Sequence, residues 1–300
     1  EEGTWYERRD TVVNKILSQA PDVIGIQEAS QGWLKDAKGK SISLSQFEDL
    51  EDRLGSPYKV TNSHRNNCVK STTPTGCVYK DQGASQGTRI FYNSKTVKLI
   101  KQGSRQLSEV KASANDRYVA WAVFEDLKTS RRFFFADTHL EHAADSSGQT
   151  TYHQLRITQT RELLETVKEN NPDKLPTFIV GDLNSSKRTT PSNGPYDTIV
   201  AAGYVDPLGN YYQSTTTAKN ATVERRINTN YASYNGFKRR PPSTTWLTAA
   251  NIDYIFTSPG TKVLEWETSV DLDAKGDFLG QIPSDHNLIR TTVQLPKSNN

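Results

Sequence analysis

The chain has 300 residues, of which 34% are hydrophobic and 24% are charged, and its formal net charge is +3. This composition favours a soluble globular protein over a disordered chain. The longest apolar runs are far shorter than the roughly 20 residues of a membrane-spanning helix, which argues against a transmembrane segment. The slight positive charge permits an anionic partner without requiring one.

The first residue of the chain and its two cysteines bear on processing and on the compartment in which the protein is found. The chain contains no Met and starts at Glu1, which indicates a processed chain or a fragment. Cys68 and Cys77 flank a polar, turn-rich stretch, and we expect them to form a disulfide worth about 2.5–3 kcal/mol. A disulfide would imply an oxidising compartment, so we expect a secreted protein. The alternative is a pair of free thiols in a cytosolic protein.

The first third of the chain predicts one helix followed by buried strands. Val12, Val13, Ile16 and Leu17 form one apolar face within residues 6–19, and this spacing predicts a helix. The apolar stretch 22–27 predicts a strand that ends just before Glu28. Further strands are predicted over 88–93, 118–126 and 131–140.

The rest of the chain predicts a second helix, three strands and one long polar tract. The helix is predicted over 153–170, before Asn171-Pro172, with Arg156 and Arg161 on its solvated face. The strands are predicted over 177–184, 251–258 and 287–295. Residues 184–245 form a long, polar, loop-rich tract, and such a tract in a compact domain is more often functional than idle. No linker divides these elements, so we expect one α+β domain over residues 1–300.

Polar residues recur in or at the ends of the apolar stretches. They are Glu28, His139, Asp182, Asn184, Asp253, Asp285 and His286. Any one of them has an ordinary explanation: Asp182, for instance, could form an Asx-turn. A buried carboxylate such as Asp253 needs a partner or a cation, because its desolvation is costly. Carboxylates gathered with few imidazoles and no thiols favour Mg²⁺ or Mn²⁺ and suit attack of water on phosphorus.

Five stretches in this order resemble the endonuclease/exonuclease/phosphatase superfamily, which has the DNase I-like fold. They are "PDVIGIQE" (21–28), "ADTHLEH" (136–142), "IVGDLNS" (179–185), "NIDYIF" (251–256) and "SDHNLI" (284–289). The resemblance implies a four-layer α/β/β/α sandwich of two mainly antiparallel sheets flanked by helices. It also implies a monomeric hydrolase that uses Mg²⁺, with Mn²⁺ or Ca²⁺ as alternatives. A looser similarity points to secreted bacterial members and deadenylase-like nucleases.

The resemblance assigns the carboxylates and the amide as follows. Glu28 looks like the metal-binding glutamate, and Asp285 resembles a further metal ligand. Asp182 is similar to the aspartate that orients the attacking water. Asn184 looks like the amide that steadies the phosphate or that water.

The resemblance also assigns the histidines. His286 looks like the histidine that contacts the phosphate, and Asp253 is similar to the aspartate that holds it charged. His139 resembles a second histidine near the phosphoryl oxygens, whereas we expect His142 to be structural or at the surface. One departure is that the family's usual first strand, which ends in an Asn near the metal, is absent before "EEGTWYERRD".

The polar tract suggests the kind of phosphate ester. Cations interleave with aromatic rings there, a combination used to bind flexible nucleic acid. The predicted substrate contacts are Arg225, Arg226, Lys238, Arg239, Arg240 and Trp246, with Tyr92 and Asn93 from an earlier strand. The alternative is a solvated loop with anchored aromatics, and an ordinary strand end for Tyr92 and Asn93. We therefore expect a nuclease first, then a phosphoesterase for a phospholipid, sphingomyelin or small phosphorylated molecule, then a binding protein with an inactive site.

Overall fold

The computed structural model describes residues 2–61, 87–210 and 221–297. The chain divides into two compact units. The first comprises Glu1–Gln19 and Asp182–Asn300, and the second comprises Ala20–Gly181. Within the described ranges, no helix has both the length and the apolar character needed to cross a bilayer. Cys68 and Cys77 lie outside these ranges, so the predicted disulfide stays a prediction.

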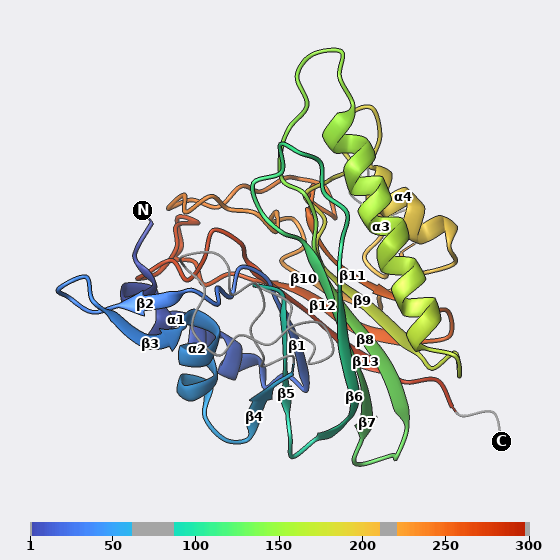
Figure 1. Cartoon of the computed structure of the whole chain (residues 1–300), viewed down its shortest axis with the longest axis horizontal. Coiled ribbons are helices and arrows are strands. Elements are labelled where there is room, and N and C mark those ends of the chain that lie inside the picture. Colours follow the sequence, from blue (N-terminus) through green and yellow to red (C-terminus); the bar gives the residue numbers. More distant parts are fainter. Residues whose placement is uncertain (1, 62–86, 211–220, 298–300) are drawn as a thin grey trace. The chain divides into compact units, whose positions relative to one another are not determined.

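The second unit contains two sheets of mainly antiparallel strands (Figure 1). One sheet has the order β1-β5-β4, with β5 antiparallel to both neighbours. The other contains β9-β8-β7-β6, and β7 is antiparallel to β6 and β8. The strands are β1 (Val23–Ile26), β4 (Tyr58–Val60), β5 (Arg89–Asn93), β6 (Val97–Gln106), β7 (Tyr118–Asp126), β8 (Arg132–His139) and β9 (Thr177–Asp182).

The two sheets of the second unit pack face to face through their apolar side chains. The rings of Tyr92 on β5 and Phe124 on β7 have centroids 5.3 Å apart. At Gly25 on β1, an added Cβ would lie 2.5 Å from Val180 and 3.0 Å from Asp137. Glycine is therefore required at this point, because any side chain would push the sheets apart.

Helices and a hairpin complete the second unit. Helix α3 (Thr151–Asn170) lies along the larger sheet and buries Leu155, Leu163 and Val167. Helix α2 (Gln46–Leu54) begins after Ser45, whose side chain and backbone bond with Glu48 in a capping box. The hairpin consists of β2 (Trp33–Lys35) and β3 (Ser41–Ser45).

The first unit is built around β12 (Lys262–Ser269). This strand pairs in parallel with β10 (Arg225–Ile227) and antiparallel with β13 (Leu288–Gln294). Trp266 on β12 is 1% exposed and packs in a cluster with Leu208, Val223 and Val263. The remaining elements of this unit are α1 (Trp5–Gln19), α4 (Gly194–Ala201) and β11 (Asp253–Thr257).

The predicted helices and strands are confirmed, and the structure adds several elements that were not predicted. The structure has helices and strands close to all the predicted ranges, and the mixed α+β class with mainly antiparallel sheets is confirmed. The tract 184–245 is loop-rich among its described residues, and it also contains α4 and β10, which were not predicted. The sequence patterns also did not predict α2, β2, β3, β4, β6 and β12.

Candidate active site

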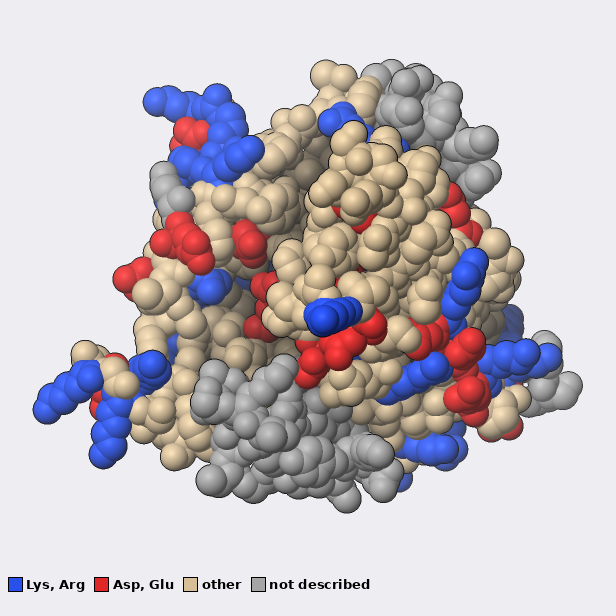
Figure 2. Space-filling view, turned by 45° about the horizontal axis from the view of Figure 1, so that its top comes forward, with Lys and Arg blue, Asp and Glu red and all other residues tan. Residues whose placement is uncertain are grey.

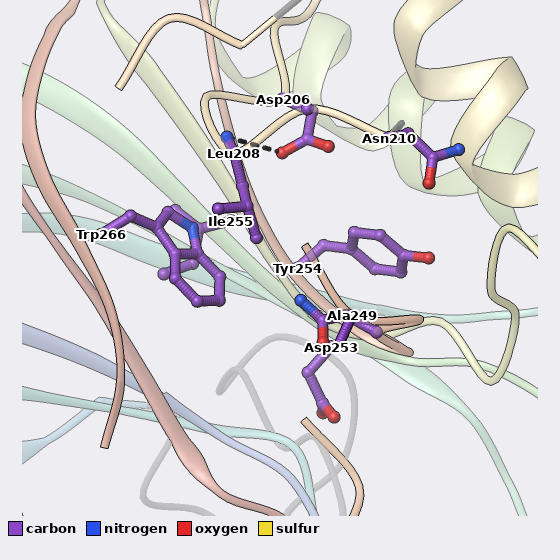
Figure 3. A pocket seen from close by; sticks show the side chains of 10 residues that line it. Asp206, Leu208, Asn210, Ala249, Asp253, Tyr254, Ile255 and Trp266 are labelled. Atoms are coloured by element: carbon purple, nitrogen blue, oxygen red, sulfur yellow. Dashed lines mark hydrogen bonds between the residues drawn. The ribbon is translucent and has the colours of Figure 1, made fainter. Parts of the chain in front are cut away.

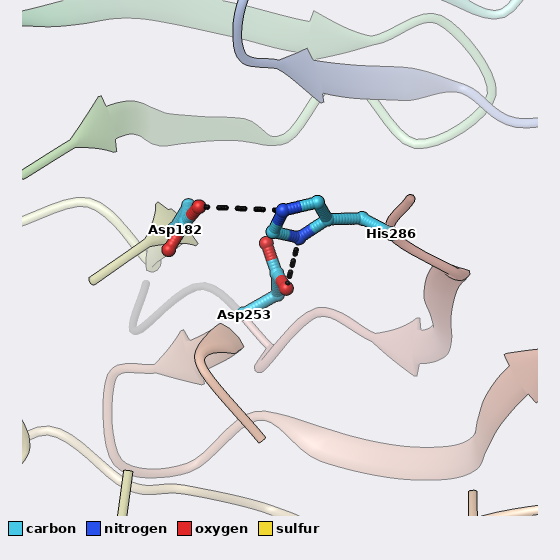
Figure 4. Close-up of side chains that lie close together, drawn as sticks. All are labelled: Asp182, Asp253 and His286. Atoms are coloured by element: carbon cyan, nitrogen blue, oxygen red, sulfur yellow. Dashed lines mark hydrogen bonds and ion pairs between the residues drawn. The ribbon is translucent and has the colours of Figure 1, made fainter. Parts of the chain in front are cut away.

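Asp182, Asp253 and His286 meet in the first unit, although they are far apart in the sequence (Figure 4). Nδ1 of His286 lies 2.8 Å from Oδ2 of Asp253. On the other side of the ring, Nε2 lies 3.8 Å from Oδ2 of Asp182. Both carboxylates are buried, so the imidazole sits between two negative charges that water screens weakly.

These carboxylates determine the charge of His286. Burial alone would lower the pKa of this imidazole. The charge and hydrogen bond of Asp253 outweigh that effect, and together with Asp182 and Asp285 they raise the pKa of His286 to about 10. At neutral pH the ring is therefore positively charged and carries a proton on each nitrogen. A charged N–H donor of this kind suits the oxygens of a phosphate group.

The turn after β9 presents Asp182 and Asn184 together. Oδ1 of Asp182 accepts the backbone N–H of Asn184 at 2.8 Å, which is an Asx-turn. Asn184 has a φ of 47°, a left-handed conformation that Asn adopts more readily than most residues. The backbone N–H of Leu183 donates to the carbonyl of Ile252, immediately before Asp253. These bonds thus hold the Asp182 carboxylate and the backbone of Asn184 next to the strand that carries Asp253.

Three residues that sequence reasoning missed hold this site. The hydroxyl of Ser233 accepts the backbone N–H groups of Ile252 and Asp253, each at 3.1 Å. The backbone N–H of Asn235 donates to the carbonyl of Asp285 at 2.7 Å. Tyr254 donates its hydroxyl proton to the carbonyl of Ser185 at 2.8 Å. Only these long-range contacts reveal the roles, because Ser, Asn and Tyr at these positions carry no distinctive spacing.

A pocket beside Asp253 contains another carboxylate, that of the partly buried Asp206 (Figure 3). Asp206 accepts the hydroxyl of Tyr196 at 2.7 Å and the backbone N–H of Leu208 at 3.1 Å. Burial raises the pKa of Asp206. Trp266 and Tyr254 line the same pocket, and the Tyr254 and Tyr196 rings lie 5.5 Å apart. The pocket residues therefore brace Tyr254 and the strand that begins at Asp253.

Glu28 belongs to the second unit and lies two residues after the end of β1. Its side chain is exposed and its φ is 58°, a conformation that most residues avoid. The backbone N–H of Ala29 donates to the carbonyl of Gly87, and that of Ser30 donates to the carbonyl of Glu28. Two backbone hydrogen bonds thus hold Glu28 in an unfavourable backbone conformation, with its carboxylate exposed to solvent. Such strained conformations cluster at functional sites.

His139 ends β8 and is buried in the second unit. Its Nδ1 lies 2.9 Å from Nη1 of Arg117, a residue that sequence analysis did not select. Arg156 does not lie on a solvated face of α3, as predicted, because it is buried and donates to the carbonyls of Glu141 and Ala143. The guanidinium lies against the turn that follows His139, because the buried carbonyls of this turn need hydrogen-bond donors. The neighbouring Arg161 is exposed, as predicted.

The predicted substrate contacts are spread over several places. Tyr92 and Asn93 lie at the end of β5 that pairs with Val23, whereas Glu28 follows the opposite end of β1. The structure therefore does not bring them to Glu28, and Tyr92 is buried in the sheet packing. This position agrees with the alternative of an ordinary strand end, and a substrate contact of Tyr92 and Asn93 stays a prediction.

The cations of the polar tract largely contact their own chain. Arg239 donates to the carbonyls of Phe278 and Gly280, and Arg240 pairs with Asp277 at 2.8 Å. On β10, Arg225 pairs with Glu265, and Arg226 is partly buried. Lys238 is exposed. On the face shown in Figure 2, basic side chains of the described residues lie in separate groups with acidic ones between them.

Trp246 lies under two cations that the sequence analysis did not select. The Arg188 guanidinium is 4.9 Å from its ring centroid and the Lys187 ammonium is 5.7 Å away. Lys187 also donates to the carbonyl and the hydroxyl of Thr248. Arg188 is exposed, so this aromatic and cationic group is accessible from solvent on that side.

The donor set of the first unit fits a hard cation only in part. One ligand atom each from Asp182, Asp253 and His286 lie within 4.8 Å of one another. His286 does not fit, because a charged imidazole that donates to Asp253 has no lone pair to offer. The Asp182 and Asp285 carboxylates do fit, since Mg²⁺ and Mn²⁺ prefer oxygen donors. In the second unit, exposed Glu28 is a donor of the same kind.

Known proteins share this chain's sequence pattern and fold. Solved structures with a similar fold include a mannosyl-6-phosphatase from Bacteroides thetaiotaomicron, which is 18% identical with a TM-score of 0.67 over 97% of this chain and 92% of that chain. The human Nocturnin catalytic domain with bound sulfate is 21% identical with a TM-score of 0.57 over 96% of this chain and 88% of that chain. These similarities confirm the predicted DNase I-like fold.

Sequence comparison adds a relative and a family. The chain is 27% identical to Nocturnin from Drosophila melanogaster over 314 residues, which cover 99% of this chain and 43% of that protein. The chain thus spans less than half the length of this relative. The model of the Endonuclease/Exonuclease/phosphatase family matches residues 2–286, nearly the whole chain. On this match, the chain belongs to the endonuclease/exonuclease/phosphatase family.

Proposed function

We propose that this protein is a divalent-metal-dependent phosphodiester hydrolase that acts on nucleic acid. Members of the family hydrolyse phosphoester bonds, which agrees with the predicted class of enzyme. The observation that carries the proposal is the position of His286 between two buried carboxylates. This arrangement keeps a positive N–H donor beside Asp182, a carboxylate that is able to accept a proton from water.

The residues of the first unit have different roles in the proposed hydrolysis. Asp182 orients the attacking water and accepts its proton, and the Asx-turn keeps this carboxylate in place. His286 donates to the phosphoryl oxygens and lowers the energy of the extra negative charge that develops on them. Asp253 holds the ring and its charge through the 2.8 Å hydrogen bond. Asn184 steadies the water or a phosphoryl oxygen with its side-chain amide.

The predicted metal ligands are Glu28 and Asp285. When bound, Mg²⁺ or Mn²⁺ would neutralise phosphate charge and make phosphorus more open to attack. Oxygen donors are the correct type for these ions, and the unusual backbone of Glu28 supports a functional role for its carboxylate. His139 is proposed to contact the phosphoryl oxygens or the leaving group.

An aromatic ring at His286 favours a substrate that contains a nucleobase. The Tyr234 ring meets the His286 ring edge to face, with centroids 5.2 Å apart, and Tyr234 is 48% exposed. Bases stack on exposed aromatic rings, and each stack is worth about 1–3 kcal/mol. Arg188 and Trp246 offer a second surface of the same kind.

A small phosphorylated molecule is the second candidate substrate. It is favoured by the bonds of Arg239 and Arg240 to their own chain, which leave fewer cations for a long polyanion. One similar fold is that of a mannosyl-6-phosphatase, whose substrate is a phosphorylated sugar. Secretion and the monomeric state stay predictions.

A substrate panel tests the proposal. The protein would be assayed with Mg²⁺ or Mn²⁺ against single- and double-stranded DNA, RNA, sphingomyelin, a sugar phosphate and bis-nitrophenyl phosphate. We expect cleavage of a nucleic acid and of the generic diester, and loss of both in Asp182→Asn. Cleavage of the sugar phosphate alone would select the second candidate. Failure on every ester at each metal would favour a binding protein with an inactive site.

A further inference from the structure

One buried guanidinium joins two histidines in the second unit. Nη1 of Arg117 lies 2.9 Å from Nδ1 of His139, and Nη2 lies 3.0 Å from Nδ1 of His142. Arg117 is 7% exposed, whereas the side chain of His142 is 54% exposed. Because the guanidinium is planar and its two arms are rigidly linked, these bonds fix the two rings relative to each other.

The bonds also decide where each ring carries its proton. A guanidinium has five N–H donors and no acceptor. Nδ1 of His139 and Nδ1 of His142 must therefore each offer a lone pair to Arg117, which places the ring proton on Nε2. Oε1 of Glu141 lies 3.3 Å from Nδ1 of His142, but it already accepts two backbone N–H groups at 2.9 and 3.0 Å. The shorter contact of His142 to Arg117 decides the tautomer.

Rigid elements hold the three side chains. Arg117 directly precedes β7, and its carbonyl accepts the backbone N–H of Leu107 at 2.8 Å. His139 is the last residue of β8, the strand that pairs with β7. The turn that carries His142 is tied to α3, because Arg156 donates to two of its carbonyls and Gln159 accepts the N–H of Glu141. Groups placed this firmly lose little freedom when a ligand binds.

We propose that His139 and His142 form a paired N–H donor site for the phosphoryl oxygens of the substrate, and that Arg117 is the positioning residue for both rings. The inference rests on the proposed function. Phosphoryl oxygens only accept hydrogen bonds, so two rings that both carry the proton on Nε2 match them. The guanidinium behind the rings adds a positive charge that attracts the same group. His142 thus gains a substrate contact where sequence analysis expected a structural or surface residue.

Nitrogen NMR on protein with labelled histidine tests the tautomers without any turnover. The chain has five histidines, so His139→Gln and His142→Gln assign the two relevant rings. In metal-free protein we expect the Nδ1 signals of both rings in the range of an unprotonated nitrogen. We expect Arg117→Lys to change at least one of them, because an ammonium cannot bridge both rings. A proton on Nδ1 of either ring in the unaltered protein would overturn the proposal.

Binding of inorganic phosphate and kinetics test the donor role. We expect His142→Ala to weaken phosphate binding and to lower kcat/KM roughly tenfold or more, the range of a hydrogen bond to a charged group. His142→Gln should recover most of the loss, because its amide supplies a donor. Arg161→Lys, an exposed arginine on α3, is the matched control for Arg117→Lys and should behave like the unaltered protein.

The outcomes separate this inference from the proposed function. Because Arg117 is buried, thermal melts must first show that its variants are folded. His142 is exposed, so its replacement should leave the fold intact. Unchanged phosphate affinity and kcat/KM in His142→Ala would overturn the paired site while hydrolysis by the unaltered protein stands. If no phosphoester is hydrolysed, the proposed function fails, and NMR with added phosphate still decides the donor site.

Discussion

Asp253 and His286 are 33 residues apart in the sequence, and a 2.8 Å hydrogen bond joins Oδ2 of one to Nδ1 of the other. Burial lowers the pKa of the ring, and the charge and hydrogen bond of Asp253 are the largest of the effects that nevertheless raise it to about 10. The bond also directs Nε2 toward Asp182. Several expected outcomes depend on this pair.

Asp182→Asn should lower phosphodiester turnover by at least about a hundredfold, because the amide cannot accept a proton from water. The side chains have the same shape, so the fold should persist. Turnover and circular dichroism would be measured side by side. Asp197→Asn, an exposed aspartate on α4, is the control for the chemical change. Near-normal turnover in Asp182→Asn would remove Asp182 from the mechanism.

The His286 charge should make stability depend on pH. Because its pKa is raised in the folded protein, the proton stabilises the fold fully below pH 6.5, and this stabilisation is lost as pH rises to about 10. A pKa that rises from 6.5 to about 10 corresponds to a loss of about 5 kcal/mol. It would be measured as the free energy of unfolding of metal-free protein relative to His286→Gln. This comparison cancels Lys187, whose pKa burial lowers to about 8 and which gives the opposite trend above that pH.

Removal of divalent metal should abolish hydrolysis while leaving most of the fold. We expect EDTA to stop turnover and excess Mg²⁺ or Mn²⁺ to restore it, because the carboxylates alone cannot neutralise the phosphate. Glu28→Gln should raise the metal concentration needed for half-maximal activity. Full activity in chelator would contradict the metal step.

Tyr234→Leu should affect substrates with a nucleobase selectively. We expect kcat/KM for the nitrophenyl ester of thymidine phosphate to fall about tenfold, from the loss of a stack worth roughly 1–3 kcal/mol. The methyl nitrophenyl phosphate, which has no base, should be cleaved as before. An equal fall for both esters would mean that Tyr234 acts on His286, whose ring it touches.

Lys238 and Arg239 should behave differently although they are neighbours. Exposed Lys238 is available to a phosphate, so Lys238→Ala should weaken polynucleotide binding and reduce its salt slope by about one. Arg239 is bonded to the carbonyls of Phe278 and Gly280, so Arg239→Ala should lower thermal stability more than Lys238→Ala does. An unchanged salt slope in Lys238→Ala would favour the small-molecule substrate.

Elements with a strong apolar periodicity could be predicted from the amino-acid pattern alone. Strand β7 spans 118–126 as predicted, because it is apolar along nearly its whole length and lies inside its sheet between β6 and β8. Strand β6 was not predicted, because it is an edge strand with many polar, exposed residues and therefore lacks an apolar pattern. Asp182, Asp253 and His286 could also be recognised as candidate site residues. They lie in or at the ends of apolar stretches, where burial of a polar group is costly unless it has a partner.

Which of these groups lie in contact follows from the folded arrangement and not from the amino-acid pattern. The Asp253–His286 bond, the Arg117 bridge and the inward position of Arg156 join segments that the chain brings together over long distances. Periodicity carries no information about such partners, because it reports which face of an element is buried and not what lies against it. The same limit explains why Arg156 was predicted on a solvated face and why Ser233 and Asn235 went unnoticed.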